Sequence, residues 1–329
     1  MHCLALSSGC SITDTALKPS EIAASIAAQA QALGFSACGV ARISDVNKAV
    51  INRWHAWIDN GHHASMEYME RYAPLRLNPE GLLPGAKSVI SLAMNYFPAE
   101  KMPAENPRIA YYAYGRDYHD VMRNKLQSLI EHIQSLAACE CRACCDTAPL
   151  FERYWAQQAG IGYAGRNSNL ILPGKGSYFF LGEVITTLEL PPSEPCHQSC
   201  GNCRRCIEAC PVGAIDENGN VDARRCISCQ TIENRGEIPA EVAQRLGKRL
   251  YGCDTCQEVC PHNKLATATT IEELTPADGL KELTYNRLQQ LTVEEFRTLF
   301  RLSAIKRAKY EGLMRNVAAL DATLFITAD

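Results

Sequence analysis

Two cysteine runs constrain the fold of this chain more than any other feature. The first, residues 200–211, reads CGNCRRCIEACP, and the second, residues 253–261, reads CDTCQEVCP. The first has the C-x2-C-x2-C-x3-C-P spacing, in which three thiolates of one tight loop bind one [4Fe–4S] cluster and the fourth cysteine binds a second cluster. The two runs therefore predict a ferredoxin-like module with two clusters, through which electrons pass.

The second run is one ligand short of a complete set. Cys226 or Cys229, which lie between the two runs, could supply the missing thiolate. The crossed ligation of two-cluster ferredoxins predicts that one cluster binds Cys200, Cys203, Cys206 and Cys260. The other cluster would bind the additional cysteine together with Cys210, Cys253 and Cys256.

Zinc ribbons and disulfides are the competing interpretations of so many cysteines. Paired C-x2-C elements also bind zinc, but the unbroken four-cysteine run and the two Cys-Pro endings favour clusters. The N-terminal residues lack the pattern of a secretory signal, so a reducing cytoplasm is expected and disulfides are not. No apolar run approaches the roughly 20 residues of a membrane helix, so we expect no association with a membrane.

Length and charge set the remaining limits. A chain of 329 residues, 47% hydrophobic and 21% charged, can form one large core and a smaller module. The net charge of −3 gives no general attraction to nucleic acid. Basic residues are nevertheless grouped at 204–205, 224–225, 248–249 and 306–315, which predicts either a local basic face or ordinary solvated helix surfaces.

The pattern of apolar residues predicts alternating helices and strands in the first part of the chain. Helices are expected over 20–33, from Asp117 or Asp120 to about 133, and over 150–159; strands are expected over 35–41, 88–94, 139–145 and 178–190. A proline-rich break follows at 191–195. We therefore expect an α/β or α+β fold with a large domain at 1–190, the cluster module at 191–263, and a helical segment at 264–329 with helices over 280–300 and 304–320.

Asp146 is the strongest candidate for acid–base chemistry. It follows an apolar strand, where side chains project into the switch-point crevice of an α/β sheet. Burial there would raise its pKa and keep it protonated as a general acid; the alternative is an N-cap of the next helix. His119, in a D-x-H motif without the glycine of histidine-ligated cobalamin proteins, is expected to be a helix-start or core residue. The glycine-rich stretch 160–169 suits either a backbone lying against a flat ligand or a surface loop.

Several longer motifs together carry a resemblance that spans nearly the whole chain. They are DTAPLFER at 146–153, AGIGYAGRN at 159–167, FLGE at 180–183, RCIS at 225–228, GCDTCQ at 252–257 and KRAK at 306–309. The stretches YGRDYH at 114–119 and MEYM at 66–69 match as well. This combination resembles the epoxyqueuosine reductase family, whose fold is related to that of reductive dehalogenases.

The resemblance implies an oxidoreductase that uses cobalamin and two [4Fe–4S] clusters. Its expected reaction removes the epoxide oxygen of epoxyqueuosine at the wobble position of tRNA, with Asp146 as proton donor and an external low-potential reductant. It also implies that Cys226, rather than Cys229, is a cluster ligand. We expect the protein to be a monomer. The expected cobalamin contacts are Arg153, Asn167, Ser168, Ser228 and Asp254.

Some features depart from the family pattern. Cys229 stands where the family tends to have an aromatic residue. The segment 306–316 lies close to the end of this sequence, whereas longer members continue into helical repeats, so RNA contacts are expected from the core and the basic C-terminal helix. Four further cysteines, expected to be buried strand thiols, are Cys139, Cys141, Cys144 and Cys145. Two alternative functions are a reductive dehalogenase of small molecules and a ferredoxin-type electron-transfer protein.

Overall fold

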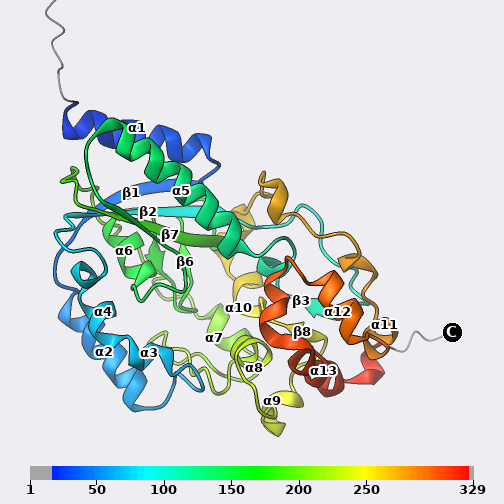
Figure 1. Cartoon of the computed structure of the whole chain (residues 1–329). Helices are drawn as coiled ribbons and strands as arrows, with labels where there is room; N and C mark the ends of the chain where they lie inside the picture. The colour runs from blue at the N-terminus through cyan, green and yellow to red at the C-terminus, as the bar shows by residue number, and fades with distance from the viewer. Residues whose placement is uncertain (1–16, 326–329) are drawn as a thin grey trace, which may run out of the picture.

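The computed structural model describes residues 17–325 and is built around a four-stranded antiparallel sheet (Figure 1). The strand order is β1-β2-β7-β4. These strands are β1 (Ala37–Arg42), β2 (Ser88–Asn95), β7 (Phe179–Thr186) and β4 (Cys141–Cys144). Seven of the eight residues of β2 are buried, so the sheet forms the centre of a packed layer rather than an exposed surface.

Helices cover both faces of this sheet (Figure 1). On one face lie α1 (Pro19–Ala32) and α5 (Tyr118–Leu136), and on the other lies α6 (Glu152–Gln158). The alternation of side chains along β2 explains this arrangement. Ile90 packs with Leu126 of α5, while its neighbour Val89 packs with Trp155 of α6.

Helix α6 approaches the sheet very closely at its carboxyl end, because β1 has a glycine there. A Cβ atom placed on Gly39 would lie 2.0 Å from the carbonyl oxygen of Ala159, the C-cap residue of α6. Any side chain at this position would push the helix away from β1. Gly39 therefore fixes the position of α6, and with it the position of the residues at the helix start.

The cysteine runs lie in a module of short elements joined by turns. Its helices are α7 (Arg205–Ala209), α8 (Ile227–Ile232), α9 (Ala240–Ala243) and α10 (Thr255–Glu258). Its strand β8 (Arg249–Tyr251) pairs in parallel with β3 (Arg108–Ile109) from the first part of the chain. A second small ribbon joins β5 (Tyr163–Ala164) and β6 (Leu170–Ile171). The module is thus hydrogen-bonded to the large α/β part.

The C-terminal part is helical and packs on the same core. Its helices are α11 (Tyr285–Gln289), α12 (Val293–Leu299) and α13 (Lys309–Ala319). The expected single helix over 280–300 is wrong, because Thr284 and Thr292 each cap a new helix. Buried Asn316 of α13 donates hydrogen bonds to the carbonyl oxygens of Thr231 and Leu250, 2.8 and 3.0 Å away, which holds α13 against the cysteine module.

The expected mixture of helices and sheets is confirmed, but one detail is wrong. Strand β4, which leads to Asp146, pairs antiparallel with β7, so its end is not the switch point of a parallel sheet.

The helices α2 (Lys48–Asp59), α3 (Tyr68–Arg71) and α4 (Ala73–Leu77) were not expected. Short 3-10 turns lie at Pro79–Leu82, Tyr111–Ala113, Pro261–Leu265, Glu272–Leu274, Leu280–Glu282, Ala304–Ala308 and Ala322–Phe325. Within residues 17–325, no helix combines the length and the apolar character needed to cross a bilayer.

Candidate functional site

A cavity of about 980 Å³ is lined by residues of both the α/β part and the cysteine module. Asp146 lies on its wall, together with residues of the polar loop 164–170 and of α8. All five residues expected to contact cobalamin line the same cavity: Arg153, Asn167, Ser168, Ser228 and Asp254. Positions that are far apart in the sequence therefore share one chamber.

Asp146 has an unusual backbone conformation at the end of β4. Its φ is +52°, in the left-handed region that non-glycine residues rarely adopt. Its backbone N–H donates to Oε1 of Glu152, 2.6 Å away. It does not cap α6, whose N-cap is Phe151, so the N-cap alternative is wrong. The turn instead directs a side chain that is 51% exposed toward the cavity.

His119 lies between two carboxylates. Its Nδ1 is 2.8 Å from Oδ1 of Asp117, and its Nε2 is 2.9 Å from Oδ2 of Asp146. A neutral imidazole has one N–H and can donate to only one of these oxygens, whereas an imidazolium donates to both. The geometry therefore favours a protonated His119.

The pKa values agree with this assignment. Burial lowers the pKa of His119, but the hydrogen bonds to Asp117 and Asp146 outweigh burial and raise the pKa to about 9. Burial raises the pKa of Asp146, but the hydrogen bond and the charge of His119 bring it below its ordinary value. The expectation that burial keeps Asp146 protonated is therefore wrong, because the proton rests on its histidine neighbour.

Tyr118 completes the surroundings of Asp146. Its hydroxyl donates to Oδ2 of Asp146 at 2.9 Å, and its ring stacks on Phe180 with centroids 4.2 Å apart. Burial, followed by the charge of Asp146, raises the pKa of Tyr118, so the phenol stays neutral and remains a hydrogen-bond donor. On the far side of the histidine, Nζ of Lys306 is 2.9 Å from Oδ2 of Asp117.

Sequence reasoning from single residues missed most of this network. His119 does lie at the start of α5, as expected, with Asp117 as the N-cap, but its ring also reaches the side chain of Asp146. The stretches YGRDYH and KRAK, which belong to the resemblance, contain Tyr118 and Lys306 as well as this histidine and its cap. These two stretches were the part of the sequence from which the network could have been predicted.

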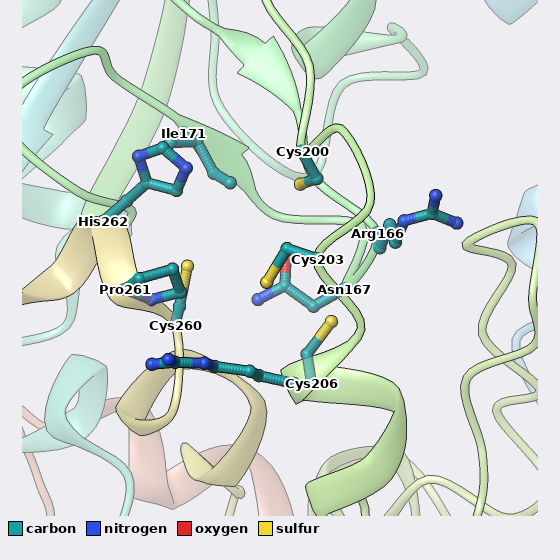
Figure 2. Close-up of a pocket in the computed structure, with 10 residues that line it drawn as sticks. Arg166, Asn167, Ile171, Cys200, Cys203, Cys206, Cys260, Pro261 and His262 are labelled. Carbon is teal, nitrogen blue, oxygen red and sulfur yellow. The ribbon is translucent and has the colours of Figure 1, made fainter.

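Four of the predicted cluster cysteines surround one small space (Figure 2). These residues, expected to bind the first cluster, are Cys200, Cys203, Cys206 and Cys260. They come from the loop before α7, from α7 itself and from the turn after α10, so the structure brings together residues about 60 positions apart. Asn167 and His262 line the same space.

The cysteines expected to bind the second cluster all line the large cavity. They are Cys210, Cys226, Cys253 and Cys256. Cys229 also lines this cavity. It is a buried residue of α8, the helix that begins directly after Cys226. Of the four cysteines around the smaller space, only Cys200 also lines the large cavity. The second set is thus the one whose four cysteines all share a cavity with Asp146.

The loop between β5 and β6 presents backbone and amide groups to the cavity. Asn167 donates to the carbonyl of Cys256 at 3.4 Å, and Ser168, with a φ of +60°, donates to the carbonyl of Gly219 at 3.0 Å. Two lining residues carry buried N–H donors that have no partner among residues 17–325, namely Nε1 of Trp54 and Nε of Arg166. The interpretation of this stretch as a ligand-facing backbone therefore suits its position.

The C-terminal basic residues are largely engaged within the protein. Arg307 forms a bidentate ion pair with Glu233 at 2.7 and 2.9 Å. Arg315 donates to the carbonyl oxygens of Asn234, Gly236 and Gln230. The KRAK segment thus holds the cavity wall in place.

The four additional cysteines lie on or beside β4, where strand thiols were expected. Cys144 is buried, and Cys139, Cys141 and Cys145 are half-buried. The Sγ atoms of Cys139 and Cys141 are 3.7 Å apart. Every cysteine within residues 17–325 is free of disulfides.

Two cysteine sets beside a chamber that contains an acid–base network define an iron–sulfur oxidoreductase. Comparison with known proteins gives the particular family. Residues 76–147 match the family described as "Epoxyqueuosine reductase QueG, DUF1730", and residues 199–263 match the "4Fe-4S double cluster binding domain". The second match supports clusters rather than zinc and lies within the expected module.

Curated relatives and solved structures agree. The chain is 42% identical to the epoxyqueuosine reductase of Leadbetterella byssophila, over 87% of this chain and 94% of that protein. It is 40% identical to the epoxyqueuosine reductase of Escherichia coli strain K12, over 87% of this chain and 77% of that protein. A crystal structure of epoxyqueuosine reductase with an epoxyqueuosine-modified tRNA-Tyr stem loop superposes with a TM-score of 0.81 and 30% identity, covering 89% of this chain and 79% of that one. The chain belongs to the epoxyqueuosine reductase family.

Proposed function

We propose that this protein reduces epoxyqueuosine to queuosine at the wobble position of tRNA, using cobalamin and two [4Fe–4S] clusters. One observation carries the proposal: a single cavity has Asp146 on its wall and the second cysteine set on the same lining. An electron donor and a proton donor can therefore reach one substrate atom. The tRNA partner is supported by the relative that was crystallised with a modified tRNA stem loop.

The cavity fits a cofactor of the size and chemistry of cobalamin. Its volume of about 980 Å³ is at the upper end of the roughly 300–1,000 Å³ of ligand pockets. The unpartnered N–H groups of Trp54 and Arg166 suit the amide carbonyls at the rim of a corrin. Its holding residues would be Arg153, Asn167, Ser168, Ser228 and Asp254. When bound, cobalamin supplies a low-potential cobalt centre that can transfer electrons to an epoxide carbon.

The residues of the chain then supply and position the proton. His119 holds a proton at Nε2, directed at Oδ2 of Asp146. As negative charge develops on the epoxide oxygen, His119 would transfer its proton to Oδ2 of Asp146, and Asp146 would donate a proton to that oxygen. Tyr118 keeps the carboxylate oriented through its 2.9 Å hydrogen bond.

The placement of the cysteines supports separate roles for the two clusters and for the three parts of the chain. We assign the outer cluster to Cys200, Cys203, Cys206 and Cys260, where an external low-potential reductant would deliver single electrons. The inner cluster would be bound by Cys210, Cys226, Cys253 and Cys256. We also assign catalysis to residues 1–190, electron transfer to 191–263, and support of the cavity wall, with contacts to tRNA, to 264–329.

The decisive experiment is anaerobic turnover of a tRNA stem loop carrying epoxyqueuosine, with and without added cobalamin. The wild-type protein with reconstituted clusters should form queuosine only when cobalamin is present. A wild-type protein that left epoxyqueuosine unchanged but reduced a haloarene would overturn the tRNA proposal in favour of a dehalogenase.

The variant Asp146→Asn tests the acid. It should retain both clusters and bound cobalamin, seen in the visible spectrum, while turnover falls by roughly 10²-fold or more, the usual contribution of a general acid. Asp120→Asn is the matched control, because Asp120 is exposed on α5 and pairs only with Arg123. Full activity of the Asp146 variant would refute the assignment.

A further inference from the structure

Three arginine side chains of the cavity wall have no acidic partner. Arg53 of α2, Arg76 of α4 and Arg153 of α6 all line the large cavity. Other arginines of the chain form salt bridges, but none of these three lies within 4.0 Å of a carboxylate oxygen of residues 17–325. Their positive charges are therefore available to a ligand in the cavity.

The three arginines are brought together because their helices pack around Phe151. The guanidinium carbon of Arg76 lies 5.7 Å from the centroid of the Phe151 ring. The ring of Trp54, which follows Arg53 in α2, meets the same ring edge-on at 6.0 Å. Arg153 is two residues after Phe151, in the first turn of α6. Apolar residues of α2, α4 and α6 share one cluster on the same side of the sheet (Figure 1), so the three charges come from a packed base.

Arg76 is a buried cation with an unused hydrogen-bond donor. Only 8% of its surface is exposed. Its Nη1 donates to the carbonyl oxygen of Leu150 at 2.9 Å, whereas its Nε has no hydrogen-bond partner among residues 17–325. Burial of a charged group that keeps an unpaired donor is unfavourable. Such a group is expected where a ligand completes the hydrogen bonds.

The carboxyl groups near the arginines do not balance all three charges. Burial lowers the pKa of Arg76 and of Arg153, and the negative charges of Glu152 and Asp146 oppose this only in part. Asp146 is already bonded to protonated His119. Burial, followed by the charge of Asp146, raises the pKa of Glu152 to about 7, so Glu152 supplies less than a full charge near neutral pH. An excess of positive charge therefore remains in this part of the wall.

The chemistry of this excess charge suits a phosphodiester. A guanidinium presents a planar fork of N–H donors that matches the oxygens of a phosphate group. Both ligands of the proposed reaction carry a phosphodiester: cobalamin in the loop that joins the corrin to its nucleotide base, and tRNA at every linkage of its backbone. The amide groups of the corrin are neutral and cannot balance the arginines.

We propose that Arg53, Arg76 and Arg153 form one anion site in the cavity wall, which binds a phosphodiester of cobalamin or of the tRNA backbone. The inference rests on the proposed function, because that function brings both ligands into the cavity. In this site the free Nε of Arg76 donates to a phosphate oxygen, and Arg53 and Arg153 balance the negative charge. The site anchors its ligand through a group that takes no part in the reaction, so its effect is on binding.

A first binding experiment tests cobalamin as the source of the phosphodiester. The wild-type protein with reconstituted clusters and the variant Arg53→Gln are each titrated with cobalamin and with cobinamide, which lacks the nucleotide loop and its phosphodiester. Arg53 is exposed, so the variant should keep its fold. If cobalamin supplies the group, Arg53→Gln should bind cobalamin about 10-fold or more weakly, the usual loss of a hydrogen bond to a charged group, and should bind cobinamide as the wild type does.

A second binding experiment tests tRNA as the source. The same two proteins are titrated with the tRNA stem loop carrying epoxyqueuosine at several salt concentrations. If the RNA supplies the group, Arg53→Gln should bind the stem loop about 10-fold or more weakly. The dependence of log Kd on log salt should also become shallower by about 0.7, the contribution of one phosphate contact to a single strand.

Two further variants complete both experiments. Arg76→Lys keeps the positive charge but lacks Nε and the planar fork, so it should weaken binding of the same ligand as Arg53→Gln does, and its melting temperature shows whether the fold is retained. Arg42→Gln is the matched control, because Arg42 is exposed on β1, pairs with Glu189 and lies outside the lining of the cavity. It should bind every ligand as the wild type does.

The outcomes separate the anion site from the proposed function. Unchanged binding of cobalamin and of the stem loop by Arg53→Gln would overturn the site, and so would equal losses for cobalamin and cobinamide or equal losses in Arg42→Gln; conversion of epoxyqueuosine by the wild type would still stand. A wild-type protein that binds neither ligand would refute the proposed function and the phosphodiester ligand. In that case inorganic phosphate decides on the site: it should raise the melting temperature of the wild type more than that of Arg53→Gln, and equal shifts would overturn the site as well.

Discussion

Replacing Asp117 by asparagine should move the pH dependence of catalysis without disturbing the fold. Asp117 caps α5 through its Oδ1, which accepts the backbone N–H of His119 at 3.2 Å. Asparagine is as good an N-cap as aspartate, so the helix start is retained. What the substitution removes is one of the two negative charges that hold the proton on His119.

The size of the effect follows from the pKa of His119. That pKa is about 9, against an ordinary value of 6.5, a difference equivalent to roughly 3 kcal/mol in favour of the imidazolium. Two carboxylates act against burial to produce it, so losing one should lower the pKa by more than about 1 pH unit. The now unpaired charge of Lys306, which bonded Asp117, lowers it further. At about pH 8 the protonated fraction then falls from about nine-tenths to about one-third or less.

The sign of the pH dependence is fixed by this direction of change. Because the folded pKa of His119 is raised, the proton is present below about pH 9 and is lost above it. The wild-type rate should therefore decline on the alkaline side with an apparent pKa near 9, and in Asp117→Asn the decline should begin at least about 1 pH unit lower. The assay is the pH profile of kcat for reduction of epoxyqueuosine in a tRNA stem loop.

A matched variant and a direct probe make this prediction refutable. Asp120→Asn removes a charge from the same turn of α5, but Asp120 pairs only with Arg123, so its profile should match the wild type. Nitrogen NMR of a sample labelled at histidine should report the same change in the pKa of His119. An alkaline limb that stays in place in Asp117→Asn, or that persists in His119→Gln, would refute the role of the histidine.

Two further predictions concern the clusters and the fold. Cys226→Ser should reduce the iron content by about half, because one of the two clusters loses a ligand, whereas Cys229→Ser should retain both; equal iron loss in the two variants would contradict the choice of ligand. Gly39→Ala should destabilise the protein by about 3 kcal/mol or more through overpacking, since its Cβ would lie 2.0 Å from the oxygen of Ala159. Gly236→Ala, whose nearest non-neighbouring atom is 3.6 Å away, should leave the melting temperature nearly unchanged, and equal melting temperatures of the two glycine variants would disprove the steric argument.

The sheet strands and the main helices of the α/β part were predictable because their apolar patterns are strong and local, whereas the helices between residues 48 and 77 were missed. The helix expected at 20–33 is α1 (Pro19–Ala32), and the strand expected at 88–94 is β2 (Ser88–Asn95). The direction of strand pairing was not predictable from these patterns. An apolar run such as 88–94 is equally compatible with parallel and antiparallel neighbours, and the sheet proved to be antiparallel.

The candidate site was predictable to the extent that single motifs carry its chemistry. Asp146 and the cysteines were identified from spacing and resemblance, and the structure places them around two spaces that share Cys200 in their linings. The protonation state of Asp146 was predicted wrongly, because it depends on the contact of its Oδ2 with His119, 27 positions earlier. The sequence can suggest that a single carboxyl group is buried. A hydrogen bond between two side chains far apart in the sequence can be recognised only in the folded structure.

The parallel pairing of β8 with β3 has a consequence for the speed of electron delivery. Domains joined only by a linker move relative to one another by default, and electron tunnelling weakens exponentially with distance, so a loosely tethered cluster would transfer charge only during brief encounters. Here the cysteine module shares a strand pair with the α/β part, and the buried amide of Asn316 joins the module to the C-terminal helix α13. This pairing would hold the proposed clusters at one distance from the proposed cofactor. Of the proposed electron-transfer steps, the arrival of an external donor would then be the one that depends on diffusion.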